Sequence, residues 1–378
     1  MKVLTITLDF LPNSGGIAVF LHNLCIQLSC LGHQVDVLKL VRKIGEEADA
    51  RQPYHVYRYV SWARLSSVVP IRHTLALHRQ HHYDVVFIGH FMTTHSLGAL
   101  ALSKLWGVPY VILSHGNDLT YSIFTRTDRI VGRWLLRNAE MMMGNSRFTA
   151  KLISKTGYKG HIEILNPGVD QGRFCPEVDT TEVRKQYSLD GRKVLLTVSR
   201  LVAKKNVDAV LHALPKVIKH VPNVLFLIAG DGGERENLER LTDKLEVQRH
   251  VRFLGHIKHD HLPALYCASN LFVMPSYASE QDRETFGISF IEANACGLPV
   301  IAAQSSGMNE AVVEGETALL VDPFNIDEIA TAIIRLLTNR ELAQRLGANG
   351  RRRVEQEFSW EKVGKRLESY LSQVVKRA

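Results

Sequence analysis

Apolar runs of strand length alternate with stretches of helical apolar spacing along most of the chain. The first run, KVLTITLDF at residues 2–10, has strand length, and residues 17–32 repeat apolar side chains at helical spacing up to Gly32. Runs of strand length return in QVDVLKL, DVVFIGH and PYVILSHG, and a helical pattern at 96–107 precedes the last of them. This repeated β-α-β order predicts a parallel sheet with helices on both faces.

The alternation weakens between residues 168 and 190, where Gly, Pro, Asp and Thr collect, and then it restarts. The later runs of strand length are KVLLTVSRL, NVLFLIAGDG, HVRFLGHI, NLFVMPS and PVIAAQ. Between the first two, residues 207–221 have a helical pattern that we expect Pro215 to interrupt.

A chain of 378 residues is too long for one ordinary core, so we predict two doubly wound α/β domains, over residues 1–175 and 176–358. A last amphipathic helix is predicted over residues 359–378, with Ser359 as its N-cap. Ligands of open α/β sheets bind beyond the carboxyl ends of the strands. We therefore expect the two domains to face a central cleft, with the functional motifs at strand ends.

Composition and cysteine usage indicate a cytoplasmic globular protein. Hydrophobic residues make up 46% of the chain and charged residues 22%, which is typical of a soluble protein. No apolar run reaches the roughly 20 residues of a membrane span, and the start lacks the basic region of a signal peptide. The five cysteines are scattered without a C-x-x-C motif, which favours reduced thiols.

The net charge of +8 comes from the first half of the chain. Residues 1–175 hold 19 Lys and Arg against 11 Asp and Glu, whereas residues 176–378 hold 27 of each kind. A basic half suggests an anionic partner, although a well-solvated surface would look the same. We find no motif typical of nucleic-acid binding.

One basic segment, residues 58–82, favours a membrane surface as that partner. It mixes Trp62, Val68 and Val69 with arginines, and Pro70 interrupts it. The arginines are Arg58, Arg64, Arg72 and Arg79. The segment predicts peripheral contact with an anionic membrane, at the inner face of that membrane.

Candidate binding groups in the first half stand at predicted strand ends. Gly15 and Gly16 precede a helix, where the backbone can approach an anion closely. They do not form a G-x-G-x-x-G motif, and an ordinary glycine turn is the alternative. His115 ends a strand and could bind a ligand or act in acid–base chemistry, although a lone histidine is more often structural. Asn145 follows another apolar run, where turn asparagines are common.

Arg200 and Lys205 follow the first strand of the second half. A guanidinium can hold phosphate oxygens in a bidentate manner and an ammonium adds a point charge, so the two together suit a diphosphate. Gly230 and Asp231 mark the turn after the next strand.

Two glutamates, Glu284 and Glu292, have seven residues between them in RETFGISFIEANACGLPV. The stretch FGISFIEANACG predicts a helix that begins near Phe286 or Gly287 and ends with Gly297 as its C′ residue. Glu284 then lies just outside the helix N-terminus and can accept hydrogen bonds from sugar hydroxyls. Glu292 lies in the apolar helix body, where a buried carboxylate needs a partner such as the two hydroxyls of a ribose.

These acids allow two other interpretations. The pair could be the two carboxylates of a glycoside hydrolase, but one of them lies in the helix body and the other next to predicted phosphate ligands. A loop with Glu280, Asp282 and Glu284 could instead bind Ca²⁺, although acidic loops are common.

Taken together, these motifs resemble the retaining glycosyltransferases of family 4, which have the GT-B fold of two Rossmann-like domains. The Glu284–Glu292 spacing is similar to the E-x7-E motif of that family, and SRLVAKKN is similar to its Arg-x4-Lys segment. The segments SGG, SHGNDL, GNS, NPGVD, AGDG, FLGHI and LFVMPS follow in the family's order, so the resemblance covers nearly the whole chain. The chain departs from the family at Thr285, where Pro, Gly or Ser is usual, and at Asn206, where Gly is usual.

The resemblance implies a role for each candidate residue in binding a nucleotide-sugar donor. Arg200 and Lys205 would neutralise the diphosphate, Glu284 would hold sugar hydroxyls, and His115 would lie near the transferred sugar, so these four form the implied catalytic set. Glu292 would bind the ribose. The implied donor-binding set is completed by Gly15, Gly16, Asn145, Gly230, His256, Ile257, Phe286, Gly287 and Ile288.

The implied reaction moves a hexose from a UDP- or GDP-linked donor to a glycan, lipid-linked or small-molecule acceptor, with retention of anomeric configuration. The chain has no D-x-D motif, which agrees with a metal-independent enzyme of this family that needs no cofactor beyond its donor. The last helix would cross back onto the N-terminal domain. The alternative of a different class is a catalytically silent protein that binds a nucleotide sugar or acts as a scaffold.

Overall fold

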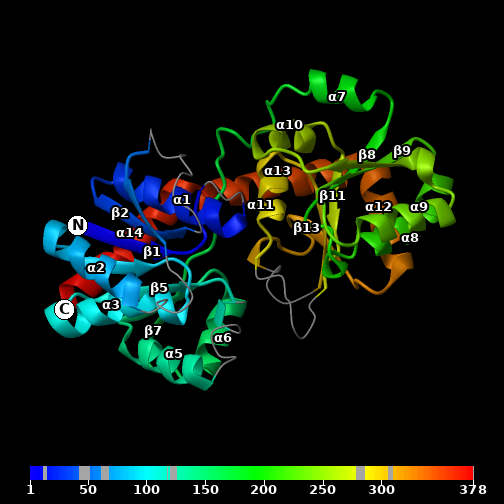
Figure 1. The fold of residues 1–378 in the computed structure, drawn as a ribbon. Helices are drawn as coiled ribbons and strands as arrows, with labels where there is room; N and C mark the ends of the chain where they lie inside the picture. The colour runs from blue at the N-terminus through cyan, green and yellow to red at the C-terminus, as the bar shows by residue number, and fades with distance from the viewer. Residues whose placement is uncertain are drawn as a thin grey trace. The chain divides into compact units, whose positions relative to one another are not determined.

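The computed structural model describes residues 1–11, 15–41, 52–60, 68–116, 118–119, 126–277, 286–304 and 310–377. They form two compact units (Figure 1). Unit 1 comprises Met1–Pro167 together with Trp360–Ala378, and unit 2 comprises Gly168–Ser359. Every ladder between named strands of the described chain is parallel, which confirms the α/β class with two Rossmann-like sheets.

Unit 1 holds a seven-stranded sheet in the order β3-β2-β1-β4-β5-β6-β7. Its strands are β1 (Lys2–Thr7), β2 (Gln34–Val41), β3 (His55–Val60), β4 (Val85–Ile88), β5 (Tyr110–Ser114), β6 (Met141–Gly144) and β7 (His161–Ile164). Its helices are α1 (Gly16–Cys30), α2 (Val68–His81), α3 (Thr93–Trp106), α5 (Arg126–Asn138), α6 (Arg147–Lys155) and α14 (Trp360–Arg377).

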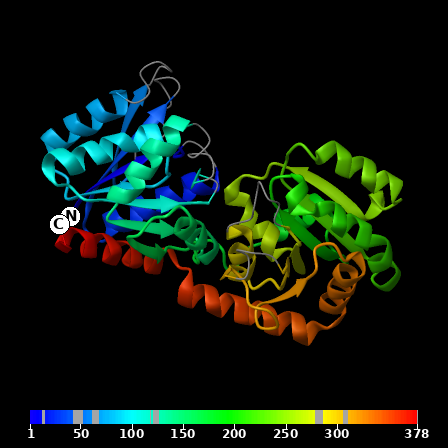
Figure 2. The ribbon, with the colours of Figure 1, turned by 90° about the horizontal axis from the view of Figure 1, so that it is seen from below.

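Successive residues of the central strands of unit 1 serve two separate cores, because strand side chains alternate between the faces of a sheet. Leu4 and Ile6 pack with side chains of α2, α3 and α5, whereas Val3 packs with side chains of α1 and α14. The predicted last helix begins at Trp360, directly after Ser359, and lies against α1 in unit 1. Both chain ends lie at the same end of this unit (Figure 2).

Unit 2 holds a six-stranded sheet in the order β10-β9-β8-β11-β12-β13. Its strands are β8 (Lys193–Val198), β9 (Val224–Ala229), β10 (Val251–Gly255), β11 (Leu271–Met274), β12 (Val300–Ala303) and β13 (Ala318–Val321). Its α-helices are α7 (Thr181–Tyr187), α8 (Val207–His220), α9 (Arg235–Lys244), α10 (Leu262–Cys267), α11 (Ile288–Ala295), α12 (Ile326–Thr338) and α13 (Arg340–Glu357). The described residues of unit 2 also form the short 3-10 helices η2 (Ala203–Lys205), η3 (Gln248–His250) and η4 (His259–His261).

The prediction that Pro215 interrupts a helix is wrong, because α8 continues through it to His220. Proline removes one backbone hydrogen bond, but the buried apolar face of α8 extends across the site, with Leu211 and Leu214 before it and Val217 after it. Packing of that face against the sheet therefore holds the helix together.

Candidate active site

The sheet order of unit 2 marks where a ligand would bind. From β8 the chain builds outward through β9 to β10, and it then returns to the other side of β8 to build β11, β12 and β13. Loops after β8 and β11 therefore leave the sheet in opposite directions, which opens a crevice at their carboxyl ends. Arg200, Lys205 and the start of α11 all follow these two strands, so their placement agrees with the predicted position at strand ends.

The two predicted phosphate ligands differ in environment. Arg200 is exposed just after β8, and no carboxylate among the described residues pairs with it. Lys205 ends η2 and is buried, with an exposed fraction of 9%. Ser199, next to Arg200, has a buried hydroxyl without a hydrogen-bond partner in the described structure. An exposed guanidinium and a buried ammonium thus follow the same strand.

Gly230 fixes the path of the segment that carries Arg200. Its φ of +138° is one that L side chains rarely adopt, and a Cβ there would lie 1.8 Å from the carbonyl oxygen of Ser199. The backbone amide of Gly230 also donates to the carbonyl of Gly255, at 2.8 Å. Only glycine allows this approach, so Gly230 positions the β8 loop through backbone contact.

The departure from the family at Asn206 has a structural reason. Its φ of +57° lies in the left-handed region, where glycine is common and asparagine is among the better-tolerated other residues. Its side-chain amide donates to the carbonyl oxygens of Pro275, at 3.0 Å, and Pro323, at 2.7 Å. Asn206 therefore ties the Lys205 turn to the loops that follow β11 and β13.

The start of α11 lies against the end of β8. Gly287 precedes the helix with a φ of +85°, and Phe286 is buried against Phe358 with ring centroids 5.6 Å apart. The Ser289 hydroxyl donates to the Val198 carbonyl at 3.0 Å. Since the first amides of a helix have no partner within it, those of Ile288 and Ser289 are suited to oxygen ligands. Glu284 lies outside the described residues, as do Glu280 and Asp282, so their roles stay predictions.

Glu292 is buried in α11 and has two protein partners that the sequence reasoning missed. Its Oε1 lies 3.1 Å from Nε2 of His259, and its Oε2 accepts a hydrogen bond from the Tyr266 hydroxyl at 3.0 Å. Burial, with the neighbouring Glu292 charge as second cause, raises the pKa of Tyr266 well above its usual value, so its proton remains available for this bond. The expected need for a partner is therefore met by two protein groups, and the ribose contact stays a prediction. Each carboxylate oxygen still has a second acceptor position.

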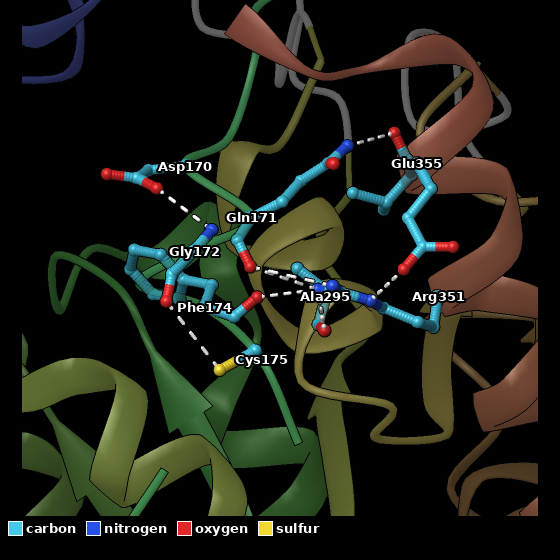
Figure 3. A network of polar contacts seen from close by, with 9 residues as sticks. Asp170, Gln171, Gly172, Phe174, Cys175, Ala295, Arg351 and Glu355 are labelled. Carbon is cyan, nitrogen blue, oxygen red and sulfur yellow. Dashed lines mark hydrogen bonds and ion pairs between the residues drawn. The ribbon is translucent and has the colours of Figure 1, made fainter. Parts of the chain in front are cut away.

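Arg351 joins the segment around Phe174 to the carboxyl end of α11 (Figure 3). Its guanidinium donates to the carbonyl oxygens of Ala295 and Phe174, each at 2.8 Å, and it pairs with Glu355 at 2.6 Å. The first bond caps the carboxyl end of α11. The ring of Phe174 lies 5.4 Å from that of His259 and 6.0 Å from that of Tyr266. His259 and Tyr266, the two partners of Glu292, thus both pack against Phe174, whose carbonyl accepts a hydrogen bond from Arg351.

The two residues predicted to meet the base follow β10. His256 is exposed, and Ile257 is half-buried against the core that includes Phe290 of α11. Neither side chain offers a specific polar contact in the described structure. Their predicted role depends on the backbone, and it stays a prediction.

In unit 1, His115 follows β5 near the switch point between β1 and β4. Its Nε2 lies 2.9 Å from the carbonyl oxygen of Gly89, and because a carbonyl only accepts, Nε2 carries the proton and Nδ1 is left as an acceptor. Burial lowers the pKa of His115 below its usual value, which favours the neutral ring.

The loop around His115 is organised by Asp118, which the sequence reasoning missed. This buried carboxylate accepts hydrogen bonds from the Ser114 hydroxyl at 2.7 Å and from the backbone amides of His115 at 3.1 Å and Phe91 at 3.3 Å. The spacing of Asp118 from His115 within SHGNDL is the pattern by which it could have been found.

The remaining candidates of unit 1 lie at the ends of other strands. Gly15 and Gly16 are exposed at the start of α1, after β1. Asn145 is buried after β6, where its Oδ1 accepts a hydrogen bond from the Thr149 hydroxyl at 2.7 Å and its backbone N–H donates to the Ser114 carbonyl at 3.1 Å. The Asn145 side chain is thus engaged in the first turn of α6. No three His, Cys, Asp or Glu side chains of the described residues form a group that could hold a metal.

Comparison with protein families gives two matches that together span most of the chain. The family described as "Glycosyltransferase Family 4" matches residues 14–173, and that described as "Glycosyl transferases group 1" matches residues 179–353. A GDP-mannose-dependent alpha-(1-6)-phosphatidylinositol monomannoside mannosyltransferase of Mycolicibacterium smegmatis is 32% identical over 378 residues, which cover 98% of each chain. The glycogen synthase of Mycobacterium tuberculosis is 26% identical over 96% of this chain and 92% of its own.

Solved structures share the fold over the full length of the chain. The sucrose-phosphate synthase of Thermosynechococcus elongatus aligns with a TM-score of 0.82 and 23% identity over 100% of both chains. HepE of Anabaena in complex with UDP aligns with a TM-score of 0.84 and 22% identity over 99% of this chain and 100% of its own.

Proposed function

The chain belongs to glycosyltransferase family 4 of the GT-B fold, and we propose that it is a retaining mannosyltransferase that uses GDP-mannose and a lipid-linked acceptor. The observation that carries the choice of donor is full-length similarity, at 31–32% identity, to relatives named as GDP-mannose-dependent mannosyltransferases. Their names include phosphatidylinositol monomannoside, which makes a glycolipid the first acceptor to test. We place the reaction in the cytoplasm, at the inner face of a membrane.

The donor contacts of this proposal follow from the crevice beyond β8 and β11. Arg200 and Lys205 bind the diphosphate, and the backbone amides at the start of α11, from Gly287 to Ser289, meet phosphate or sugar oxygens. Glu292 accepts hydrogen bonds from the ribose hydroxyls through its second acceptor positions, while Tyr266 and His259 fix its orientation. Gly15, Gly16, Asn145, His115, Gly230, His256, Ile257, Phe286 and Glu284 keep the roles that the family resemblance implies.

The main catalytic contribution of these residues is to stabilise the negative charge that develops on the diphosphate. The bond between the sugar C1 and the phosphate oxygen breaks, and the acceptor oxygen bonds to C1 on the same face. The departing phosphate oxygen takes the acceptor proton. Negative charge grows on the diphosphate, where a guanidinium and an ammonium stabilise it without a metal ion. The transferred sugar keeps its anomeric configuration.

A thermal-unfolding series with GDP-mannose, GDP, UDP-glucose and UDP tests the donor. A ligand at about 100 times its dissociation constant stabilises the protein by about 2.7 kcal/mol. We expect this with the GDP series, and a loss of about tenfold in affinity for Glu292→Gln, since hydrogen bonds to a charged acceptor contribute at least about 1.5 kcal/mol. Glu316→Gln, at an exposed glutamate of the same unit, is the matched control.

Transfer is measured separately, with GDP-mannose and a membrane lipid extract, by the appearance of a mannosylated lipid. The one-bond carbon–proton coupling at the anomeric carbon of the product distinguishes retention from inversion. Binding without transfer to any acceptor would favour the silent nucleotide-sugar-binding alternative. Absence of stabilisation by every nucleotide would refute the proposed donor site.

A further inference from the structure

Large exposed apolar side chains gather on three neighbouring helices of unit 1. Helix α3 contacts both α2 and α5 on one face of the sheet (Figure 1). Among the described residues, Phe324 is the one large exposed hydrophobic side chain that lies elsewhere. The others are Val68 on α2, Leu105 and Trp106 on α3, and Ile130 and Trp134 on α5. Single exposed apolar residues are ordinary, but their concentration on adjoining helices indicates an interaction surface.

Helix α5 combines exposed apolar and exposed cationic side chains within this surface. Ile130 and Trp134 are exposed by 68% and 52%, and Arg133 and Arg137 are exposed beside them. The spacing i, i+3, i+4, i+7 places these four side chains on one stripe of the helix. In the described structure neither arginine has a carboxylate partner. The stripe therefore combines two large apolar groups with two unpaired cations.

The three helices contain many basic residues and almost no acidic ones. Helices α2 and α3 contain no Asp or Glu, and Asp128 is the one acid in the sequence of α5. Arg79 of α2 lies over the ring of Trp106 of α3, 5.6 Å from its centroid, so cationic and aromatic groups meet across the helix boundary as well. Lys104 and Arg72 add further positive charge to these helices.

We propose that this α2–α3–α5 face docks unit 1 on an anionic phospholipid surface, with Ile130 and Trp134 entering the interface and Arg133 and Arg137 at the lipid phosphates. Tryptophan and aliphatic side chains favour the boundary between headgroups and acyl chains, and arginines beside them meet anionic headgroups. Exposed isoleucine and leucine have no comparable role against a nucleic acid. Docking of this kind leaves the helices in the plane of the surface, and no helix of the described chain is long and apolar enough to cross a membrane.

This inference extends the predicted membrane contact beyond residues 58–82. The segment 58–82 was expected to carry it, but Trp62 and Arg64 lie outside the described residues and Val69 is half-buried. The carboxyl end of α3 and the exposed stripe of α5, neither of which the sequence analysis predicted, provide most of the exposed apolar side chains. The surface also agrees with a lipid-linked acceptor, although the docking itself requires no donor and no transfer.

Co-sedimentation of the full chain with vesicles tests the proposal. We expect binding to phosphatidylcholine vesicles that contain phosphatidylglycerol and little binding to phosphatidylcholine alone. Neutralising both arginines, as Arg133→Gln with Arg137→Gln, should weaken partitioning about 25-fold, at about fivefold for each arginine near an anionic surface. Replacing the apolar pair, as Ile130→Ser with Trp134→Ser, should also abolish most binding. All four side chains are exposed, so the variants should unfold at the wild-type temperature.

Matched controls come from unit 2. Phe324→Ser removes a hydrophobic side chain that is 73% exposed, and Arg240→Gln with Lys244→Gln removes two exposed cations of α9. Both controls should bind vesicles like the wild type. Brominated lipids should quench the fluorescence of the wild type more strongly than that of Trp134→Phe, if Trp134 enters the interface.

Three results would overturn the proposal. The first is equal or no binding to anionic and neutral vesicles. The second is vesicle binding that both α5 double variants leave unchanged. The third is binding that needs the arginines but not Ile130 and Trp134 and that heparin reproduces, which would assign the face to a soluble polyanion. None of these depends on GDP-mannose, so failure here and failure of the proposed donor are separate outcomes.

Discussion

Replacing Tyr266 with Phe removes one hydrogen bond to the buried Glu292 carboxylate and changes little else. The Tyr266 side chain is fully buried, and its hydroxyl lies 3.0 Å from Oε2 of Glu292. A hydrogen bond to a charged group contributes about 1.5–3 kcal/mol, and the carboxylate would be left with His259 as its remaining partner. We therefore expect unit 2 to lose about 2–3 kcal/mol of unfolding free energy, which corresponds to a fall of about 4–12 °C in its midpoint.

Urea denaturation at neutral pH measures this loss, and Tyr110→Phe is the matched control. Tyr110 is equally buried, but its hydroxyl donates to the neutral carbonyl of Leu135, at 2.5 Å. A neutral bond contributes only about 1 kcal/mol, so the control should be the milder variant. In a Glu292→Gln background the cost of Tyr266→Phe should fall to that of the control, because the charge is gone.

The pH dependence provides a second, independent readout. The folded-state pKa of Tyr266 is raised, mainly by burial, so below about pH 10 both states hold the proton and the stabilisation is complete. Above about pH 10 the unfolded chain releases this proton while the folded chain keeps it. The wild type then loses about 1.4 kcal/mol per pH unit through this residue, and the gap to Tyr266→Phe closes. A gap at pH 7 no larger than that of the control, or one that does not shrink at high pH, would refute this account of Glu292.

Four further predictions concern the loops and histidines around the strand ends. Gly230→Ala should destabilise unit 2 by about 3 kcal/mol or more in urea denaturation, because its Cβ meets a backbone carbonyl, whereas Gly233→Ala, where nothing lies within 4 Å, should change little. Asn206→Gly keeps the left-handed backbone but loses two hydrogen bonds, so it should cost about 1–3 kcal/mol, and Asn206→Ala, which adds strain, should cost more. Asp118→Asn replaces one of the two accepting carboxylate oxygens with an NH2 donor, so the side chain can no longer accept all of its present hydrogen bonds. The variant should therefore speed amide hydrogen exchange in the loop after β5. Burial lowers the pKa of His95 to about 4, so the stability of unit 1 should be constant above about pH 6.5 and fall by about 3 kcal/mol toward pH 4 through this residue, unlike that of His95→Gln.

The hydrophobic pattern and the capping residues predicted helix boundaries well where those local features determine them. The helix that carries Glu292 ends as expected, with Gly297 at a φ of +71° and its amide bonded to the Asn294 carbonyl. Its start, at Ile288, lies one or two residues later than predicted. Pro215 was misjudged because local propensity says nothing of the packing that holds α8 on both sides of it.

The partners of Glu292 could not be read from the sequence for a different reason. His259 and Tyr266 lie 33 and 26 residues away along the chain, and only the sheet order brings them to α11. Neither stands in a motif with Glu292. Asp118 is the contrary case, because it stands three residues after His115 and bonds to that residue's own amide. Contacts within one loop follow from spacing, whereas contacts between elements require the fold.

The return of α14 to unit 1 affects how the chain can fold while the ribosome makes it. Val363, Leu367 and Leu371 of α14 complete the same core as Leu21 and Leu24 of α1. At typical translation rates, residues 168–359 take roughly 10–40 s to synthesise, and during that time this face of α1 has no cover. Unit 2, whose segments are contiguous, can finish folding before the N-terminal unit does. The nascent chain therefore presents an apolar helix face to chaperones until α14 emerges.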